Sequence, residues 1–239
     1  MTPTLASLVD SPALGPRPFL TWYGAEGERI ELSGAVTANW VAKTVNLLVE
    51  ELDAGPGTLI RIDLPPHWRT AVWALASWRT GAGVVLDGSS GSAGALVTDR
   101  PAAAAAGELD GDFGELLAQV LPSLARSFDG ELPRGAIDAA RVVGGFGDVV
   151  GFVAPPDPGA PAVVRAGTTT THAELEGWAS ELPAGARLAV RVGSREPAEL
   201  EAFAALVLGA LRAGTSLVLL AGEQDLERIC ASERAEPWG

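Results

Sequence analysis

Residues 57–88 read GTLIRIDLPPHWRTAVWALASWRTGAGVVLDG. The apolar runs at 59–64 and 84–87 predict two short strands, and the stretch 68–80 between them predicts a helix. Strands that are joined through a helix are normally parallel, and the connection is almost always right-handed. Gly81 follows the helix at the position where a left-handed residue commonly ends one. The segment therefore predicts a β-α-β unit of a parallel sheet.

The same pattern returns near the end of the chain. Residues 187–192 predict a strand, residues 197–213 a helix and residues 214–220 a second strand. Arg212-Ala213-Gly214 matches Arg79-Thr80-Gly81 at the end of the helix. Strands as apolar as these have to be covered on both faces. The predicted fold class is α/β, with two pseudo-repeated, doubly wound parallel-sheet subdomains.

Further elements are expected around these two units. Residues 19–32 predict a hairpin, and Ser33 is a favourable cap for a helix that runs to about Leu52. Helical spacing predicts two more helices, at 116–128 and at 172–182.

The Pro-rich segment 154–161 has the composition of a linker. We therefore place residues 1–153, with the hairpin, in a first α/β half and residues 162–239 in a second. The two halves are expected to pack as one compact unit.

The composition restricts the partners and the location. The formal net charge of −13 argues against nucleic acid and anionic membranes as partners. Cys230 is the one cysteine, so no disulfide can form within the chain. Met1–Asp10 lacks the features of a signal peptide, and no stretch reaches the roughly 18 apolar residues of a membrane span. We expect a cytoplasmic protein, and the sequence leaves its oligomeric state open.

One polar stretch is a candidate for binding a ligand. Its residues are Gly167, Thr168, Thr169, Thr170, Thr171 and His172. Backbone N–H groups and hydroxyls in a turn before a helix can bind a phosphate, because the helix dipole favours an anion. The alternative is a Thr-rich helix cap without a ligand, since a phosphate loop usually also carries a lysine. ATP or AMP is the cofactor that such a degenerate loop would bind, and weakly. The cleft is expected between the halves, near Asp87 and Asp99 at the strand ends.

The sequence offers no catalytic residue and no metal site. His67 and His172 lie at helix starts, where partly exposed caps are expected, and two histidines alone do not hold a metal. Ser77 lies in an apolar helix and Cys230 has no base nearby in sequence. Neither has the positioned base that an activated nucleophile needs.

The order of these elements resembles the N-terminal region of adenylate-forming enzymes, which are the acyl-CoA synthetases, luciferases and non-ribosomal peptide adenylation domains. The resemblance lies in Glu31–Gly34, Asn39–Leu48, Ile60–Pro65 and Ala74–Val85. In the second half, Thr171-His-Ala-Glu-Leu175 is similar to the segment that follows the phosphate loop of this family. Within the family, the chain resembles short actinobacterial proteins of unknown function.

The chain departs from the family at the phosphate loop, Ser/Thr-Gly-Thr-Thr-Gly-x-Pro-Lys. In one register Gly167-Thr168-Thr169 matches Gly-Thr-Thr, but Thr170 replaces the second glycine and Ala173 the lysine. In the other register the loop is deleted, and Thr171-His172 opens the next helix. By the resemblance, the adenine and ribose contacts and the domain with the catalytic lysine would lie beyond Gly239.

The resemblance implies a truncated, catalytically inactive protein of the AMP-binding, acyl-CoA synthetase-like class, which binds a small molecule or a protein partner. The main alternative is an AMP-forming acyl or amino-acid ligase that acts with a second polypeptide. A third hypothesis is a regulatory half that binds a complete synthetase. The sequence leaves the identity of ligand, substrate and partner open.

Overall fold

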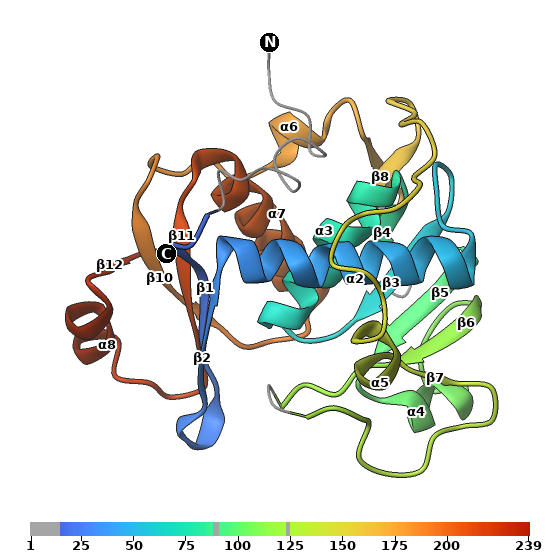
Figure 1. The fold of residues 1–239 in the computed structure, drawn as a ribbon, viewed down its shortest axis with the longest axis horizontal. Helices are drawn as coiled ribbons and strands as arrows, with labels where there is room; N and C mark the ends of the chain where they lie inside the picture. Colours follow the sequence, from blue (N-terminus) through green and yellow to red (C-terminus); the bar gives the residue numbers. More distant parts are fainter. Residues whose placement is uncertain (1–14, 88–90, 123–124) are drawn as a thin grey trace. The chain divides into compact units, whose positions relative to one another are not determined.

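The computed structural model describes residues 15–87, 91–122 and 125–239 (Figure 1). These residues form two compact units. Unit 1 consists of the described residues up to Trp40, residues 65–72 and residues 179–239. Unit 2 consists of residues 41–64 and 73–178. The segment 154–161 therefore lies inside unit 2. The two units also differ from the halves 1–153 and 162–239, because each unit contains residues from both halves.

The sheet of unit 1 has the strand order β12-β10-β11-β1-β2. Its strands are β1 (Pro18–Tyr23), β2 (Arg29–Ser33), β10 (Arg187–Val192), β11 (Ser216–Ala221) and β12 (Glu236–Pro237). β1 and β2 pair antiparallel around a short 3-10 helix, η2 (Ala25–Gly27), so the predicted hairpin is confirmed. The remaining neighbours in this sheet are parallel.

Helices α7 (Pro197–Ala213) and α8 (Leu226–Glu233) contact this sheet, α7 through β11 and α8 through β10 and β12. Val218 and Leu220 of β11 pack with Ile229 of α8. Leu217 and Leu219 point to the opposite face of the sheet, because side chains alternate along a strand. These four side chains of β11 are fully buried. β11 is therefore covered on both faces, as expected for a strand with parallel neighbours on both sides.

The sheet of unit 2 has the strand order β7-β6-β5-β3-β4-β8-β9. Its strands are β3 (Leu59–Asp63), β4 (Gly83–Val85), β5 (Ala93–Thr98), β6 (Phe113–Ala118), β7 (Ile137–Asp138), β8 (Pro161–Arg165) and β9 (Thr168–Thr171). β8 and β9 pair antiparallel, and the other neighbours are parallel. Short helices pack on it: α4 (Pro101–Ala105) and α5 (Ala139–Val143) contact β6, and α6 (Leu175–Trp178) contacts β9.

The two longer helices of the first half form where they were predicted. They are α2 (Gly34–Leu52) and α3 (Trp68–Thr80), and each has residues in both units. Ser33 caps α2, because its Oγ accepts a hydrogen bond of 3.2 Å from the N–H of Val36. Gly81, with φ +87°, follows α3, and Gly214, with φ +63°, ends α7.

Both predicted β-α-β units are confirmed. β3 and β4, joined by α3, are parallel neighbours with Leu59 opposite Gly83. β10 and β11, joined by α7, are parallel neighbours with Arg187 opposite Ser216. The two sheets with their flanking helices give the α/β class that the sequence predicts.

The repeat extends to five strands of each sheet. The order β5-β3-β4-β8-β9 in unit 2 matches β12-β10-β11-β1-β2 in unit 1, with the same parallel and antiparallel pairs. Each hairpin precedes its own β-α-β unit along the chain but joins the sheet of the other one. The hairpins are therefore exchanged between the two repeats.

One predicted helix does not form in the described residues of its segment, which exclude 123–124, and another is shorter than predicted. The first residues of 116–128 belong to β6, where Leu116 and Leu117 pair with β5, so backbone pairing overrides the helical spacing. The helix predicted at 172–182 is reduced to α6, and the N–H of Ser180 donates to the carbonyl of Ala205 in α7 at 3.0 Å instead of continuing a helix.

The packing of α7 predicts that Gly209 does not tolerate a side chain. A Cβ at Gly209 would lie 2.2 Å from the carbonyl oxygen of Ser180. Gly209→Ala is expected to lower the free energy of unfolding by about 1–3 kcal/mol, because backbone has to move. Urea denaturation at neutral pH measures the change. The matched control is Gly177→Ala in α6, where the new Cβ meets open space, so the effect is neutral or slightly stabilising. Equal destabilisation by both variants would contradict the close approach.

The exchange of hairpins predicts that the two parts of the chain fold only together. A cut in the exposed segment 155–159 leaves β1 and β2 without β11 in one fragment, and β8 and β9 without β4 in the other. Neither fragment alone is expected to unfold cooperatively, whereas an equimolar mixture regains a cooperative transition. Circular dichroism during heating measures this. Two fragments that each unfold cooperatively would show that the exchange is not needed for folding.

Candidate functional site

The predicted ligand stretch, Gly167–His172, lies at the turn and second strand of the β8–β9 hairpin. Arg165 pairs with Thr168, so Ala166 and Gly167 alone form the turn, and Gly167 has a φ of +73°. His172 extends the pairing, since its N–H donates to the carbonyl of Ala160 at 3.0 Å. The expected polar turn is therefore a strand, because β-branched threonines favour strands and a two-residue turn with glycine favours a hairpin.

The N–H group of Thr171, just before α6, is bound by a carboxylate of the chain itself. Glu174 Oε2 accepts from both the N–H and the Oγ1 of Thr171, each at 2.9 Å. These hydrogen bonds lower the pKa of Glu174 below its usual value. Sequence reasoning missed Glu174, although the spacing Thr-x-x-Glu is a capping-box signal. α6 has only four residues, so its dipole offers little attraction for an anion.

Asp87 lies beside the hairpin turn, as the sequence analysis expected. Its Oδ2 accepts a hydrogen bond of 2.6 Å from the N–H of Ala166. Asp99 follows β5, which β3 separates from β4 in the sheet, so the structure does not place it beside the turn. The end of β3 instead has its own polar cluster, in which Asp63 binds Thr98 and Arg100, each at 2.6 Å.

His172 is half-buried at the base of the hairpin. Its Nε2 is buried and has no hydrogen-bond partner among the described residues. Burial lowers the pKa of His172 below the usual 6.5, although the backbone of Ala82 and Gly81 and the charge of Asp157 act in the opposite direction. The ring is therefore neutral at pH 7 and adds no positive charge to this end of the sheet.

The one lysine of the chain, Lys43, lies in α2 and is held by residues 144–148. Lys43 Nζ lies 2.7 Å from Asp148 Oδ1 and donates to the carbonyls of Phe146 at 2.6 Å and Gly144 at 3.3 Å. Near the hairpin turn, Arg165 supplies a cation, and its Nε donates to Thr168 Oγ1 at 2.9 Å. Lys43 is thus engaged with residues 144–148 and not with the hairpin.

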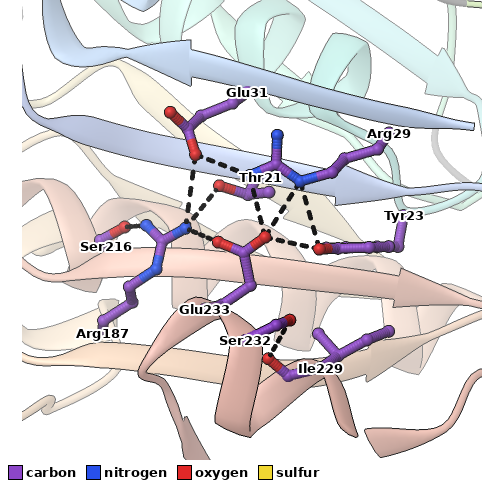
Figure 2. A network of polar contacts seen from close by, with 9 residues as sticks. All are labelled: Thr21, Tyr23, Arg29, Glu31, Arg187, Ser216, Ile229, Ser232 and Glu233. Atoms are coloured by element: carbon purple, nitrogen blue, oxygen red, sulfur yellow. Dashed lines mark hydrogen bonds and ion pairs between the residues drawn. The ribbon is translucent and has the colours of Figure 1, made fainter.

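A second polar cluster joins α8 to the sheet of unit 1 (Figure 2). Glu233, the last residue of α8, accepts from Tyr23 Oη at 2.5 Å, Arg187 Nη2 at 2.5 Å and Arg29 Nε at 3.0 Å. Burial alone would raise the pKa of Glu233, but the hydrogen bonds from Tyr23, Arg187 and Arg29 outweigh it and lower that pKa. Arg187 also donates to Ser216 and Thr21. The cluster fastens α8 to the sheet. No local sequence pattern predicts it, because its residues are far apart in the sequence.

A third cluster in unit 1 surrounds His67, which caps α3. His67 is 2% exposed, so the prediction of a partly exposed cap is wrong in its exposure. Its ring centroid lies 4.3 Å from that of Trp22, and its Nδ1 accepts from the N–H of Arg69 at 3.1 Å. The guanidinium of Arg69 lies 4.4 Å from the ring centroid of Trp68. Burial, and then the charge of Arg69, lower the pKa of His67 to about 3.

Two kinds of site are not found in the described part of the chain. No group of three or more histidine, cysteine, aspartate or glutamate side chains there is arranged to hold a metal ion. No helix there is long and apolar enough to cross a membrane.

The pKa of His67 predicts a loss of stability in mild acid. In the unfolded chain His67 titrates near 6.5, and in the folded protein near 3. Its contribution is therefore complete above pH 6.5 and is lost as the pH falls from 6.5 towards 3, by up to about 4–5 kcal/mol. Urea denaturation between pH 7.5 and 4 measures this slope.

The matched variant is His67→Asn, which keeps a capping side chain but does not titrate. It is expected to be less stable at pH 7.5 and to have a flatter dependence of stability on pH. His172 and Glu233 titrate in both proteins and contribute equally to both slopes. The same slope for the variant and the wild type would contradict the assignment.

The fold is that of the N-terminal part of acyl-CoA synthetases, a class of adenylate-forming enzyme. An acyl-CoA synthetase from Brucella canis superposes with a TM-score of 0.73 and 16% identity, over 97% of this chain and 46% of its own. The acetoacetyl-CoA synthetase from Streptomyces lividans gives 0.71 and 18%, over 97% of this chain and 41% of its own. The chain therefore spans less than half the length of these two enzymes.

The chain belongs to the TIGR03089 family. A TIGR03089 family protein of Mycobacterium tuberculosis is 36% identical to it over 241 residues, which are 97% of this chain and 96% of that protein. No family model matches the chain. The name of the relative states a family and no activity.

Proposed function

We propose that the chain is a non-catalytic protein with an adenylate-forming fold, which works in the cytoplasm as a binding module for a small molecule or a protein. The observation that carries the proposal is the two-residue turn, Ala166-Gly167, between β8 and β9. The enzymes that the chain resembles have the eight-residue phosphate loop at this place. Thr168 and Thr169 are strand residues, which favours the register in which that loop is deleted.

The polar groups at the hairpin support the proposal, because carboxylates already occupy two of its backbone donors. The N–H of Ala166 binds Asp87, and the N–H of Thr171 binds Glu174. A phosphate would have to displace one of these carboxylates and remain close to its negative charge. A phosphate and a carboxylate are both negative and repel each other at close range, so ATP or AMP binds here weakly at best.

The position of the lysine supports the same conclusion. Adenylation concentrates negative charge on the α-phosphate, and a single preorganised donor there is worth about 10²–10³ in rate. Lys43 is bound to Asp148 and to two backbone carbonyls. Its use in catalysis would require all three contacts to break.

The second candidate is an AMP-forming acyl or amino-acid ligase that acts with a second polypeptide. The observation that favours it is the retained fold, which superposes on synthetases over 97% of this chain. In that case the partner would provide the cationic and nucleotide-binding groups.

The proposal predicts that the purified chain does not adenylate carboxylic acids. The assay is ATP–pyrophosphate exchange with a panel of fatty, aryl and amino acids, with an active acyl-CoA synthetase as positive control. No exchange above the buffer rate is expected, because the hairpin carries no lysine in either register of the comparison with the family's phosphate loop.

Exchange that increases with protein concentration, in a preparation free of other synthetases, would contradict the non-catalytic assignment. A thermal-shift titration with Mg-ATP separates binding from catalysis. A large stabilisation without exchange would keep the protein non-catalytic and make a nucleotide its ligand.

A further inference from the structure

The loop of residues 144–152, GGFGDVVGF, is fixed to α2 by hydrogen bonds. Asn46 of α2 is 5% exposed, and its Nδ2 donates to the carbonyls of Gly147 at 3.0 Å and Val149 at 2.9 Å. Its Oδ1 accepts from the N–H of Gly151 at 2.9 Å. One side chain thus binds both arms of the loop.

Lys43, one turn earlier on the same face of α2, holds the first part of the loop. It binds the carbonyls of Gly144 and Phe146 and the carboxylate of Asp148. Together with Asn46 it gives the loop a defined conformation, although four of the nine residues are glycine. A loop that is already ordered loses little conformational entropy when it binds a partner.

This fixed loop presents two large apolar side chains to solvent. Val149 and Phe152 are each 80% exposed. The other exposed large apolar side chains of the described residues, Val36 and Trp238, are 41% and 40% exposed. Single exposed apolar residues are common on protein surfaces. Two such side chains, three positions apart on an anchored loop, are the arrangement of a small binding anchor.

Acidic residues border the loop. The side chain of Asp148, next to Val149, is 61% exposed. Beyond Phe152 the chain follows the end of α2, since a Cβ at Gly55 would lie 3.7 Å from the Cβ of Ala154. The exposed acidic residues at that end of α2 are Glu50, Glu51 and Asp53. Because Asp148 is paired with Lys43, the acidic border of the apolar pair lies on one side, at the end of α2.

We propose that Val149 and Phe152 dock into an apolar pocket with a basic rim on a partner protein. The two side chains bury on the order of 300 Å², far below the roughly 1,200–2,000 Å² of a stable interface. A second copy of the chain would bring two acidic borders and two net charges of −13 together. The occupant is therefore a different protein with arginine or lysine around an apolar pocket, and the contact is transient. This surface lies outside the hairpin and does not depend on whether the chain binds a nucleotide.

The experiment places a photo-crosslinking phenylalanine analogue at position 152 of the full chain in its native host. The same analogue at position 238, another exposed apolar site, is the control. The protein crosslinked at position 152 is identified and purified, and its affinity for the wild-type chain is measured by titration calorimetry. We expect one protein with a basic surface, crosslinked from position 152 and not from position 238.

The purified partner then tests the apolar contact and the electrostatic attraction separately. The exposed side chain of Phe152 takes no part in core packing, so Phe152→Ser should not affect folding. It should weaken binding about 10-fold or more, as for a central anchor of an interface. Trp238→Ser should leave the affinity unchanged. Raising the salt from 50 to 300 mM should weaken binding several-fold, because the rims are oppositely charged. The thermal midpoint of each variant confirms that it folds.

Four results would overturn the proposal: crosslinks to a second copy of the chain, vesicle binding that depends on Phe152, an affinity that Phe152→Ser leaves unchanged, or no crosslink above the level at position 238. Phosphatidylcholine vesicles, free of net charge, are the probe for the membrane outcome.

Discussion

Both sheets depend on one constraint: the open edge strand of each parallel β-α-β unit needs a hydrogen-bonding partner. After β3 pairs with β4 and β10 with β11, the free edges of β4 and β11 still present unpaired N–H and carbonyl groups. Buried groups of this kind cost free energy unless they are paired. β8 pairs with the edge of β4, and β1 with that of β11, so each edge is completed by a hairpin of the other repeat. The fully buried leucines of β11 show how completely this strand is enclosed.

The same hairpin geometry determines the chemistry near β4. A two-residue turn brings β8 and β9 together without leaving a loop that could surround a phosphate. Asp87 then binds the N–H of Ala166 in the turn, and Glu174 binds the N–H of Thr171 at the far end of β9. Two backbone donors of this hairpin are thus directed at the protein's own carboxylates. Lys43 follows the same rule, since it orders the loop of residues 144–152.

The sequence predicted the elements whose signals are local. Apolar runs of strand length, a helix between them and Gly81 or Gly214 after it were sufficient for both β-α-β units. β9 was missed because four threonines are compatible with a capped turn as well as a strand, and its pairing with β8 decides between them. The helix expected at 116–128 failed for the same reason, since the pairing of β6 with β5 overrides spacing. Of the candidate site, Asp87 was expected near Gly167–His172 from its place at the end of a predicted strand, whereas Glu233 and Arg187 meet only through the tertiary fold.

The pairing of β1 with β11 has a consequence for the time course of synthesis. Thr21 lies opposite Val218, so β1 waits during synthesis for a strand that is made about 200 residues later. At about 5–20 residues per second this interval is roughly 10–40 s. The sheet of unit 2 has all its strands once β9 leaves the ribosome, but the hairpin of unit 1 then still has an open edge and exposes the apolar side chains of β1. Open strand edges pair readily with other chains. On a polysome, neighbouring nascent chains carry the same hairpin, so the interval before β11 emerges is when aggregation competes most strongly with folding.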